Sequence, residues 1–138
     1  MALTPYENLA SLLHEFTGLP GVDTATVRDF EERSRQRRSL SGLSHLALAI
    51  PVVLVDRQTL KKLPRNDPDL FWNRFYQLYP GASGHIVLSA VGYNPTRDLA
   101  LVTADVGCGG LCGNGYIVVL RRAGGAWKIA TIKGTWIS

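Results

Sequence analysis

The chain lacks the features that mark several large classes of protein. Its 138 residues include two cysteines, three histidines and one methionine, and its formal net charge is only +4. The longest strongly apolar run, 46–55, has about half the length that a membrane helix needs, and Pro51 interrupts it. No internal repeat or low-complexity tract is present. We therefore expect neither a membrane span nor a repeat architecture.

A recognisable targeting signal is also missing. The opening MALTPYENLA has no basic segment followed by an apolar core, as a secretory signal peptide would. The expected location depends on the natural start of the chain. It is cytoplasmic if Met1 is that start, and extracytoplasmic if a leader was removed.

The positive charge is modest and partly local, concentrated in the arginines of 33–38, where a solvated helix end accounts for it. Nucleic-acid binding would require basic residues interleaved with exposed aromatic residues on one sheet face. Arg121, Arg122, Lys128 and Lys133 fall on the last two expected strands, but opposite registers would split them between faces. Nucleic acid is therefore the least favoured partner, and a small molecule or a protein, including a second copy of this chain, stays open.

The composition is that of an ordinary globular protein, 46% hydrophobic and 19% charged. This length supports one domain with a real core, which we place over 1–138. Residues 1–45 are expected to be helical, and 46–138 to combine helix with sheet.

Capping signals place the helices. Thr4-Pro5-Tyr6-Glu7 predicts a helix start, and Gly18 is the expected stop. A second helix should begin at Asp23 or Thr24 and bury Val27 and Phe30. The apolar run 46–55 with its proline allows only an edge strand or a bend.

Two further helices follow. Asp56 caps a short helix through Leu63, which Pro64 ends. Asp67-Pro68-Asp69 begins the strongest helix, because it combines an N-cap, a proline in the first turn and acids near the positive dipole end. Its wide aromatic stripe predicts heavy burial.

From Gly84 onward the apolar period falls to two. Strands are expected at 85–94, 99–106, 116–122 and 126–137, with short connections that permit only antiparallel neighbours. The predicted fold class is therefore α+β, with N-terminal helices on a C-terminal four-stranded antiparallel meander.

The glycine-rich stretch GCGGLCGNGY, 107–116, raises the question of a chemical centre. Its glycines lead into a strand and not a helix N-terminus, which disfavours a phosphate cradle. A zinc site needs about four ligands, and the histidines have no finger spacing, so we expect no metal. Cys108 and Cys112 enclose three residues, unlike a thioredoxin centre. No cofactor is expected.

The hairpin interpretation remains for this stretch. If Gly109, Gly110 and Leu111 form the loop, Cys108 and Cys112 face each other within disulfide reach. In a reducing compartment they would be two small thiols. A bulge at Asn114-Gly115 would change the direction of the Tyr116 side chain, which makes Tyr116 a candidate for ligand contact.

Aromatic residues supply the other ligand candidates. Trp72 and Tyr79 are candidates for ligand contact, although aromatic sets of this kind usually belong to the core. Trp136, close to the last residue, should pack against the helix carrying Trp72 and Phe75, because chain ends fray unless they are tied down.

Catalytic residues are hard to identify. Asp105 and His85 are the two candidates, and Asp105 is either an exposed strand residue or a carboxylate inside a pocket. Neither has a recognisable partner of the kind that a nucleophile or general base requires. A non-catalytic binding or accessory module is the favoured function, and whether the protein is an enzyme is left open.

The second half of the chain, 72–138, resembles a family of uncharacterised small bacterial domains. The shared pattern is W-x2-F-x3-Y-P-G, then L-S-x-V-G-Y-N, C-G-x2-C-G-x-G-Y and the closing W-I-S, beginning at Trp72, Leu88, Cys108 and Trp136. The resemblance implies export or lipid anchoring and supplies no catalytic residue.

The order of elements also resembles, more loosely, cystatin-like and nuclear-transport-factor-like (NTF2-like) folds, in which helices lie against a curved antiparallel sheet. This likeness implies an apolar pocket within a cone. The alternative function that follows from this likeness is a small-molecule hydrolase, isomerase or cyclase. A nucleic-acid-binding module is the second alternative.

Overall fold

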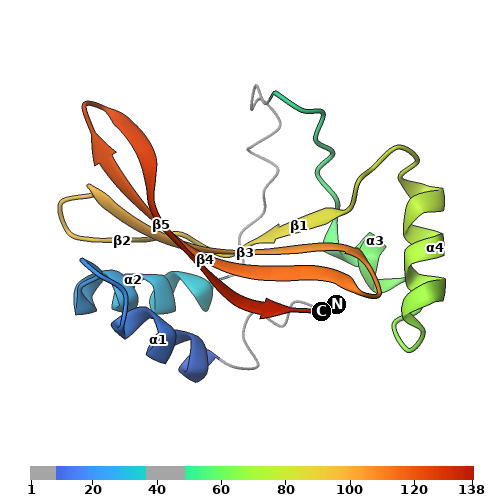
Figure 1. Ribbon diagram of the computed structural model, residues 1–138, viewed down its shortest axis with the longest axis horizontal. Coiled ribbons are helices and arrows are strands. Elements are labelled where there is room, and N and C mark those ends of the chain that lie inside the picture. The colour runs from blue at the N-terminus through green and yellow to red at the C-terminus, as the bar shows by residue number, and fades with distance from the viewer. Residues whose placement is uncertain (1–8, 37–48) are drawn as a thin grey trace.

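The computed structural model describes residues 9–36 and 49–138 (Figure 1). Within these ranges it contains four helices and a five-stranded antiparallel sheet, which confirms the α+β prediction. The expected helix start at Thr4 and residues 46–48 lie outside the described residues. In the described part of the chain, no helix is long and apolar enough to cross a membrane.

The four described helices are α1 (Leu9–Thr17), α2 (Thr24–Ser34), α3 (Arg57–Lys61) and α4 (Pro68–Leu78). Three of them, α2, α3 and α4, begin where capping residues predict them. The Asp23 carboxylate accepts a hydrogen bond from the Thr26 amide at 2.8 Å, and Asp67 accepts one from the Leu70 amide at 3.0 Å. These bonds satisfy amides that have no partner inside the helix.

One expected alternative for the apolar run before α3 is wrong. Residues 49–55 form no strand; a bend occupies 49–50, and Val53 is 71% exposed. Pro51 removes a ladder donor, and the extended residues after it pair with no strand of the described sheet. The bend, which is the other alternative, is what the structure shows.

The sheet is a meander with the order β1-β3-β4-β5, and the short β2 also pairs with β3. Its strands are β1 (His85–Leu88), β2 (Gly92–Tyr93), β3 (Leu99–Gly109), β4 (Cys112–Ala123) and β5 (Ala126–Ile137). The expected single strand over 85–94 is therefore split. The Ser89 hydroxyl oxygen accepts a hydrogen bond from the Thr103 amide at 2.8 Å. A side chain thus takes the place of a backbone carbonyl at this point and interrupts the pairing of the strands.

The principal core lies between α1, α2 and one face of the sheet. Phe16, Phe30, Leu101 and Ile117 are fully buried there, and the Phe16 and Phe30 rings meet edge to face at 4.9 Å. Helix α2 approaches β2 closely because Gly92 on β2 has no side chain. A Cβ atom at Gly92 would lie 2.5 Å from the Cβ atom of Phe30. The predicted burial of Phe30 is confirmed.

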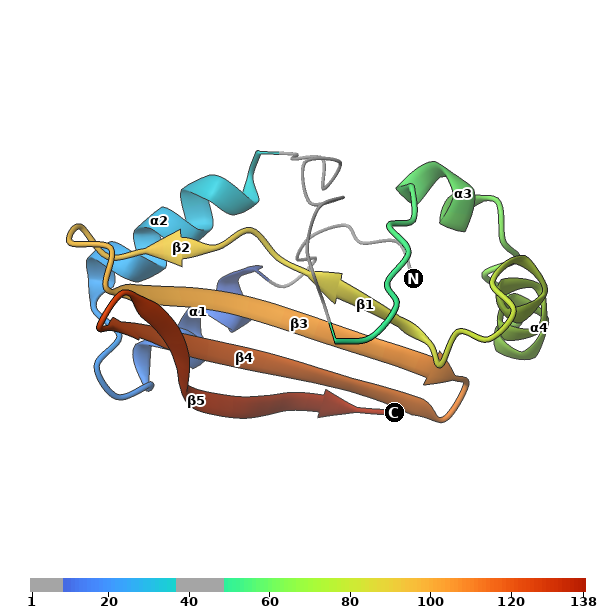
Figure 2. The ribbon, with the colours of Figure 1, turned by 90° about the horizontal axis from the view of Figure 1, so that it is seen from above.

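The other pair of helices lies at the opposite end of the sheet, as Figures 1 and 2 both show. Phe71 and Phe75 of α4 pack with Leu63 into a second, smaller cluster. The expectation of heavy burial for α4 is wrong, since Leu70 is 42% and Leu78 52% exposed. The helix packs beside the end of β3 and does not lie across the sheet.

The second face of the sheet leaves large apolar side chains exposed. Ile86 is 63% exposed, Leu88 52% and Ile132 56%. The registers Leu88↔Ala104↔Tyr116 and Val118↔Ile132 place them opposite the face that α1 and α2 cover. Among the described residues, the helices therefore enclose only one face of the sheet.

A candidate binding pocket at the cysteine turn

A pocket of about 240 Å³ lies where α4 meets the turn between β3 and β4. Trp72 of α4, His85 of β1 and Trp136 of β5 line it, together with Gly107 and Gly113 at the turn. These residues come from elements far apart in the sequence. Such convergence is typical of ligand sites.

Strand register explains how these side chains reach one face. His85 pairs with Gly107, which pairs with Gly113, while Asp105 pairs with Gly115, which pairs with Trp136. Paired residues share a face, and alternate residues of one strand do too. This is also the face that carries Leu101 and Ile117 under α1 and α2. The pocket and the principal core therefore occupy two ends of one surface.

Three glycines, which we call the glycine floor, lie under the aromatic rings at this end of the sheet: Gly107 and Gly113, which line the pocket, and Gly115, which lies under the Trp136 indole beside it. A Cβ at Gly107 would lie 2.9 Å from His85 Cε1 and 3.2 Å from the Trp72 ring. A Cβ at Gly115 would overlap the Trp136 indole. The floor thus lets aromatic rings rest directly on the backbone of the sheet.

Trp136 is held by this floor and by Asp105. Its indole Nε1 donates a hydrogen bond to Asp105 Oδ1 at 2.8 Å. Trp72 lies instead over Gly107, on the other side of the pocket. The expected packing of Trp136 against the helix of Trp72 and Phe75 is not what the structure shows. Residue 136 pairs with Gly115, its indole lies on Gly113 and Gly115, and it is not part of the apolar cluster around α4.

His85 forms part of the aromatic wall. Its ring stacks on Trp72 with centroids 5.3 Å apart and an interplanar angle of 24°, and it also contacts Phe75. Its Nδ1 is buried without a hydrogen-bond partner. Burial lowers the pKa of His85, because a charged ring there would lose its water. The imidazole is therefore neutral at neutral pH.

In the described part of the chain, no hydrogen bond joins His85 to Asp105. They occupy diagonal positions on β1 and β3, since Asp105 is opposite Val87. Asp105 Oδ1 accepts a hydrogen bond from the Trp136 indole N–H, and His85 Nδ1 has no hydrogen-bond partner that could orient the ring. Among the described residues, no three His, Cys, Asp or Glu side chains gather as metal ligands would.

Cys108 and Cys112 are joined by a disulfide, with Cα atoms 5.1 Å apart. They do not face each other across the hairpin as expected, because Gly109 pairs with Cys112 and the register shifts between Gly107 and Gly109. Cys108 is thus the extra residue of a β-bulge. Closing so short a loop contributes only about 2 kcal/mol of stability.

The remaining candidate residues lie elsewhere. Tyr116 pairs with Ala104 and so points to the face opposite the glycine floor. Tyr79 packs against Phe75 at 5.2 Å, outside the pocket lining. Of the four basic residues, Arg121 pairs with Lys128 and Lys133 pairs with Ile117, so these three share one face, whereas Arg122 pairs with Trp127 on the other face.

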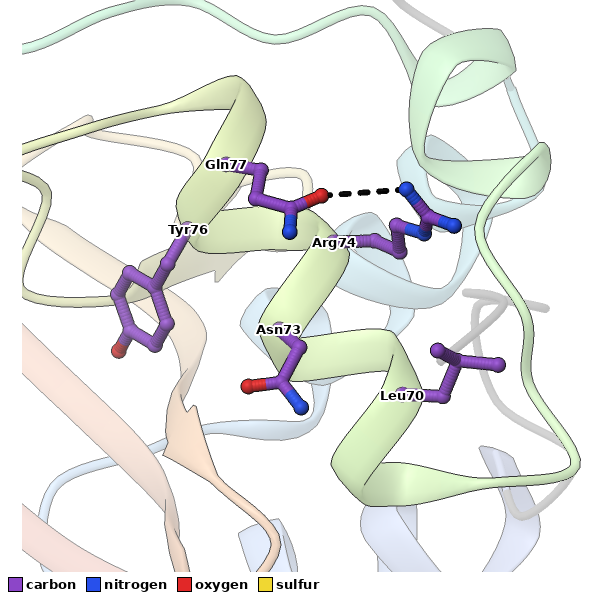
Figure 3. A pocket seen from close by; sticks show the side chains of 5 residues that line it. All are labelled: Leu70, Asn73, Arg74, Tyr76 and Gln77. Carbon is purple, nitrogen blue, oxygen red and sulfur yellow. Dashed lines mark hydrogen bonds between the residues drawn. The ribbon is translucent and has the colours of Figure 1, made fainter.

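A larger depression of about 490 Å³ follows the outer surface of α4 (Figure 3). All five of its residues belong to this one helix. Arg74 donates a hydrogen bond to Gln77 at 3.2 Å, while Tyr76 points to the other side of the helix in Figure 3. No second element contributes a side chain, so we place the candidate site at the cysteine turn.

The glycine floor is the feature of the site that the sequence interpretation misses. Glycine at alternate strand positions, as at 113 and 115, signals a close approach of another group. In the sequence alone, these glycines are interpreted only as turn residues. The Trp136–Asp105 bond has no comparable signal, because the two residues are 31 apart in sequence.

Comparison with protein-family models, with curated proteins and with solved structures finds no match to this chain.

Proposed function

We propose that this protein is a non-catalytic binding module that holds one small ligand in the pocket over the glycine floor. The observation that supports this most is the arrangement of Trp72, His85 and Trp136 around bare backbone. Aromatic side chains recognise flat apolar faces. The ligand is therefore a single aromatic or sugar ring.

The size of the pocket supports this class of ligand. Pockets for drug-sized ligands have volumes of about 300–1,000 Å³, whereas this pocket has about 240 Å³. Arg65 and Ser138 also line the pocket and are the polar groups available to orient a ring substituent.

The interactions of Asp105 and His85 favour binding over catalysis. Asp105 accepts a hydrogen bond from the Trp136 indole N–H, so one oxygen of its carboxylate holds Trp136 in place at the side of the pocket. His85 is neutral and stacked, with no group to orient it. A general base needs a partner that fixes its tautomer and orientation.

An enzyme of the hydrolase, isomerase or cyclase type remains the second candidate, because His85 does line the pocket. Phenyl acetate offers a ring that fits and a bond whose cleavage is easily followed. Hydrolysis above the spontaneous rate that disappears in His85→Phe would favour this candidate.

We further propose a likeness to cystatin-like and NTF2-like folds. The packing of α1 and α2 on one face of a bent antiparallel sheet supports it. The pocket would then correspond to the open end of a cone, formed where the helices leave the sheet uncovered.

The binding proposal can be tested by titrating the protein with phenol, indole and methyl glucoside while amide and indole NMR signals are recorded. We expect saturable binding of at least one probe, with a dissociation constant on the order of millimolar. The shifts should be confined to α4, the cysteine turn and the end of β5. Failure of all three probes to saturate would argue against the proposal.

Two matched variants separate the pocket from the rest of the surface. Trp72→Leu removes one wall and should weaken binding severalfold. Trp127→Leu changes a tryptophan in β5 that is 39% exposed and contacts Tyr93 instead. It should leave binding unchanged. Equal effects of the two substitutions would indicate nonspecific association with exposed aromatic rings.

A further inference from the structure

The disulfide turn forms one wall of the pocket. Gly109, Gly110 and Cys112 line it together with the flanking Gly107 and Gly113. So many glycines give the backbone of this wall little intrinsic preference for one conformation. The covalent link between Cys108 and Cys112 is therefore the main local constraint on its shape.

The same turn also holds α4 in place. The Tyr76 hydroxyl donates a hydrogen bond to the Cys108 carbonyl at 2.7 Å. That carbonyl belongs to the residue left unpaired by the bulge, and so it is free to accept. Trp72 lies one helical turn before Tyr76, and their rings are 5.8 Å apart. The position of the Trp72 wall therefore depends on the position of Cys108.

We infer that the Cys108–Cys112 disulfide is a reducible site that sets the shape of the pocket. With the bond intact, the bulge presents the Cys108 carbonyl to Tyr76 and keeps both walls at their observed spacing. Reduction releases the bulge, weakens the Tyr76 contact and lets the Trp72 wall move away from the glycine floor. The consequence for ligand affinity rests on the proposed binding function, whereas the change of shape does not.

The chemistry is thiol–disulfide exchange with a dithiol reductant. A thiolate of the reductant attacks the sulfur of Cys112, which is exposed, whereas Cys108 is half-buried. The S–S bond breaks, a mixed disulfide forms, and Cys108 leaves as a thiolate that takes up a proton. The second thiol of the reductant then attacks the mixed disulfide and releases Cys112. Two electrons and two protons reach the protein, and the reductant leaves as its own disulfide.

The effect should be local. The loop closed by the disulfide is short, so its loss removes little of the total stability. The principal core under α1 and α2 lies at the other end of the sheet and contains neither cysteine. Leu111, at the tip of the turn, is 93% exposed, so a reductant meets little obstruction.

The test compares the oxidised chain, the chain treated with dithiothreitol, and the Cys108→Ser/Cys112→Ser double variant. Amide hydrogen exchange and the indole signals are recorded first without ligand. We expect exchange at 107–115 and in α4 to rise about tenfold or more on reduction, with α1, α2 and the centre of β4 unchanged. The double variant should match the reduced chain and ignore dithiothreitol.

Phenol binding is then measured in the oxidised and reduced states. We expect its affinity to fall about fivefold or more on reduction. Faster exchange on reduction with no phenol binding in either state would overturn the proposed binding function and leave the control of shape standing. Unchanged exchange at 107–115, or unfolding of the whole chain, would overturn the inference itself.

Tyr76→Phe examines the link between the turn and the helix. It keeps the ring but removes the hydroxyl that binds the Cys108 carbonyl. In the oxidised state it should move the Trp72 indole signal toward its position in the reduced chain. Tyr79→Phe, at the C-cap of the same helix, is the control and should not shift this signal. Equal behaviour of the two variants would show that the Tyr76 contact does not transmit the change.

Discussion

The two ends of one sheet face are built from the same strands but do opposite things. Under α1 and α2, β3 and β4 present Leu101, Ile117 and Val119, which are at most 1% exposed. At the cysteine turn the same strands present Gly107, Gly113 and Gly115. Branched aliphatic side chains fill the space beneath a helix, whereas glycines leave room that aromatic rings border only partly. A change of residue at alternate positions thus turns a core into a pocket.

The largest effect should come from the filled end. Phe30→Ala removes a fully buried ring, which should cost about 3–5 kcal/mol of unfolding free energy. For a domain of this size, Tm should fall by roughly 10–20 °C. Trp72→Leu alters a half-buried residue of the pocket and should cost clearly less. Thermal unfolding followed by circular dichroism measures both, and equal losses would show that the pocket is as much a core as the helix-covered end.

A smaller effect should follow from filling the floor. In Gly115→Ala the new methyl group overlaps the Trp136 indole, and such overpacking costs about 1–3 kcal/mol. The indole Nε1–H signal of Trp136 should shift as its bond to Asp105 is disturbed. Gly134→Ala is the control, because no atom lies within 4 Å of its Cβ position. Its stability should stay within about 0.5 kcal/mol of the wild type. An undisturbed Trp136 signal in Gly115→Ala would contradict the close packing described above.

The smallest effect should be a pH dependence of Tm that comes from His85 at the pocket end of the sheet. Burial lowers the pKa of His85 in the folded chain, whereas histidine in an unfolded chain titrates near about 6.5. As the pH falls through the unfolded-state pKa, the unfolded chain takes up the proton before the folded chain does. The free energy of unfolding therefore decreases as the pH falls from this pKa toward the lower pKa of the folded state. Tm should therefore decline slightly between about pH 8 and pH 5.5, a window chosen to lie above the usual carboxylate range.

His85→Phe keeps an aromatic ring against Trp72 and cannot titrate, so this variant should lose that decline. His14→Gln, an exposed histidine replacement on α1, should keep it. A decline that persists in His85→Phe would assign the pH dependence to another group. Differential scanning calorimetry at several pH values would measure the effect.

The sequence predicted the local features well, since those depend on neighbouring residues. Asp23, Asp56 and Asp67 cap helices where they were expected to, because a cap needs only its own side chain and amides two or three residues on. The period of two after Gly84 predicted the antiparallel meander, since short connections leave no other pairing. The split at Ser89 could not be predicted in this way because it depends on Thr103 across the sheet.

Amino-acid order alone therefore determined where α2, α3 and α4 begin, the antiparallel class of the sheet and the nearness of the two cysteines. Only the tertiary structure decided that Trp72, His85 and Trp136 share a pocket and that Tyr116 points away from it. The physical reason is register. The bulge at Cys108 and the extra residue Thr135 in the pairing of β5 with β4 settle which face the side chains around the pocket take. Such shifts follow from packing across strands, which no local pattern contains.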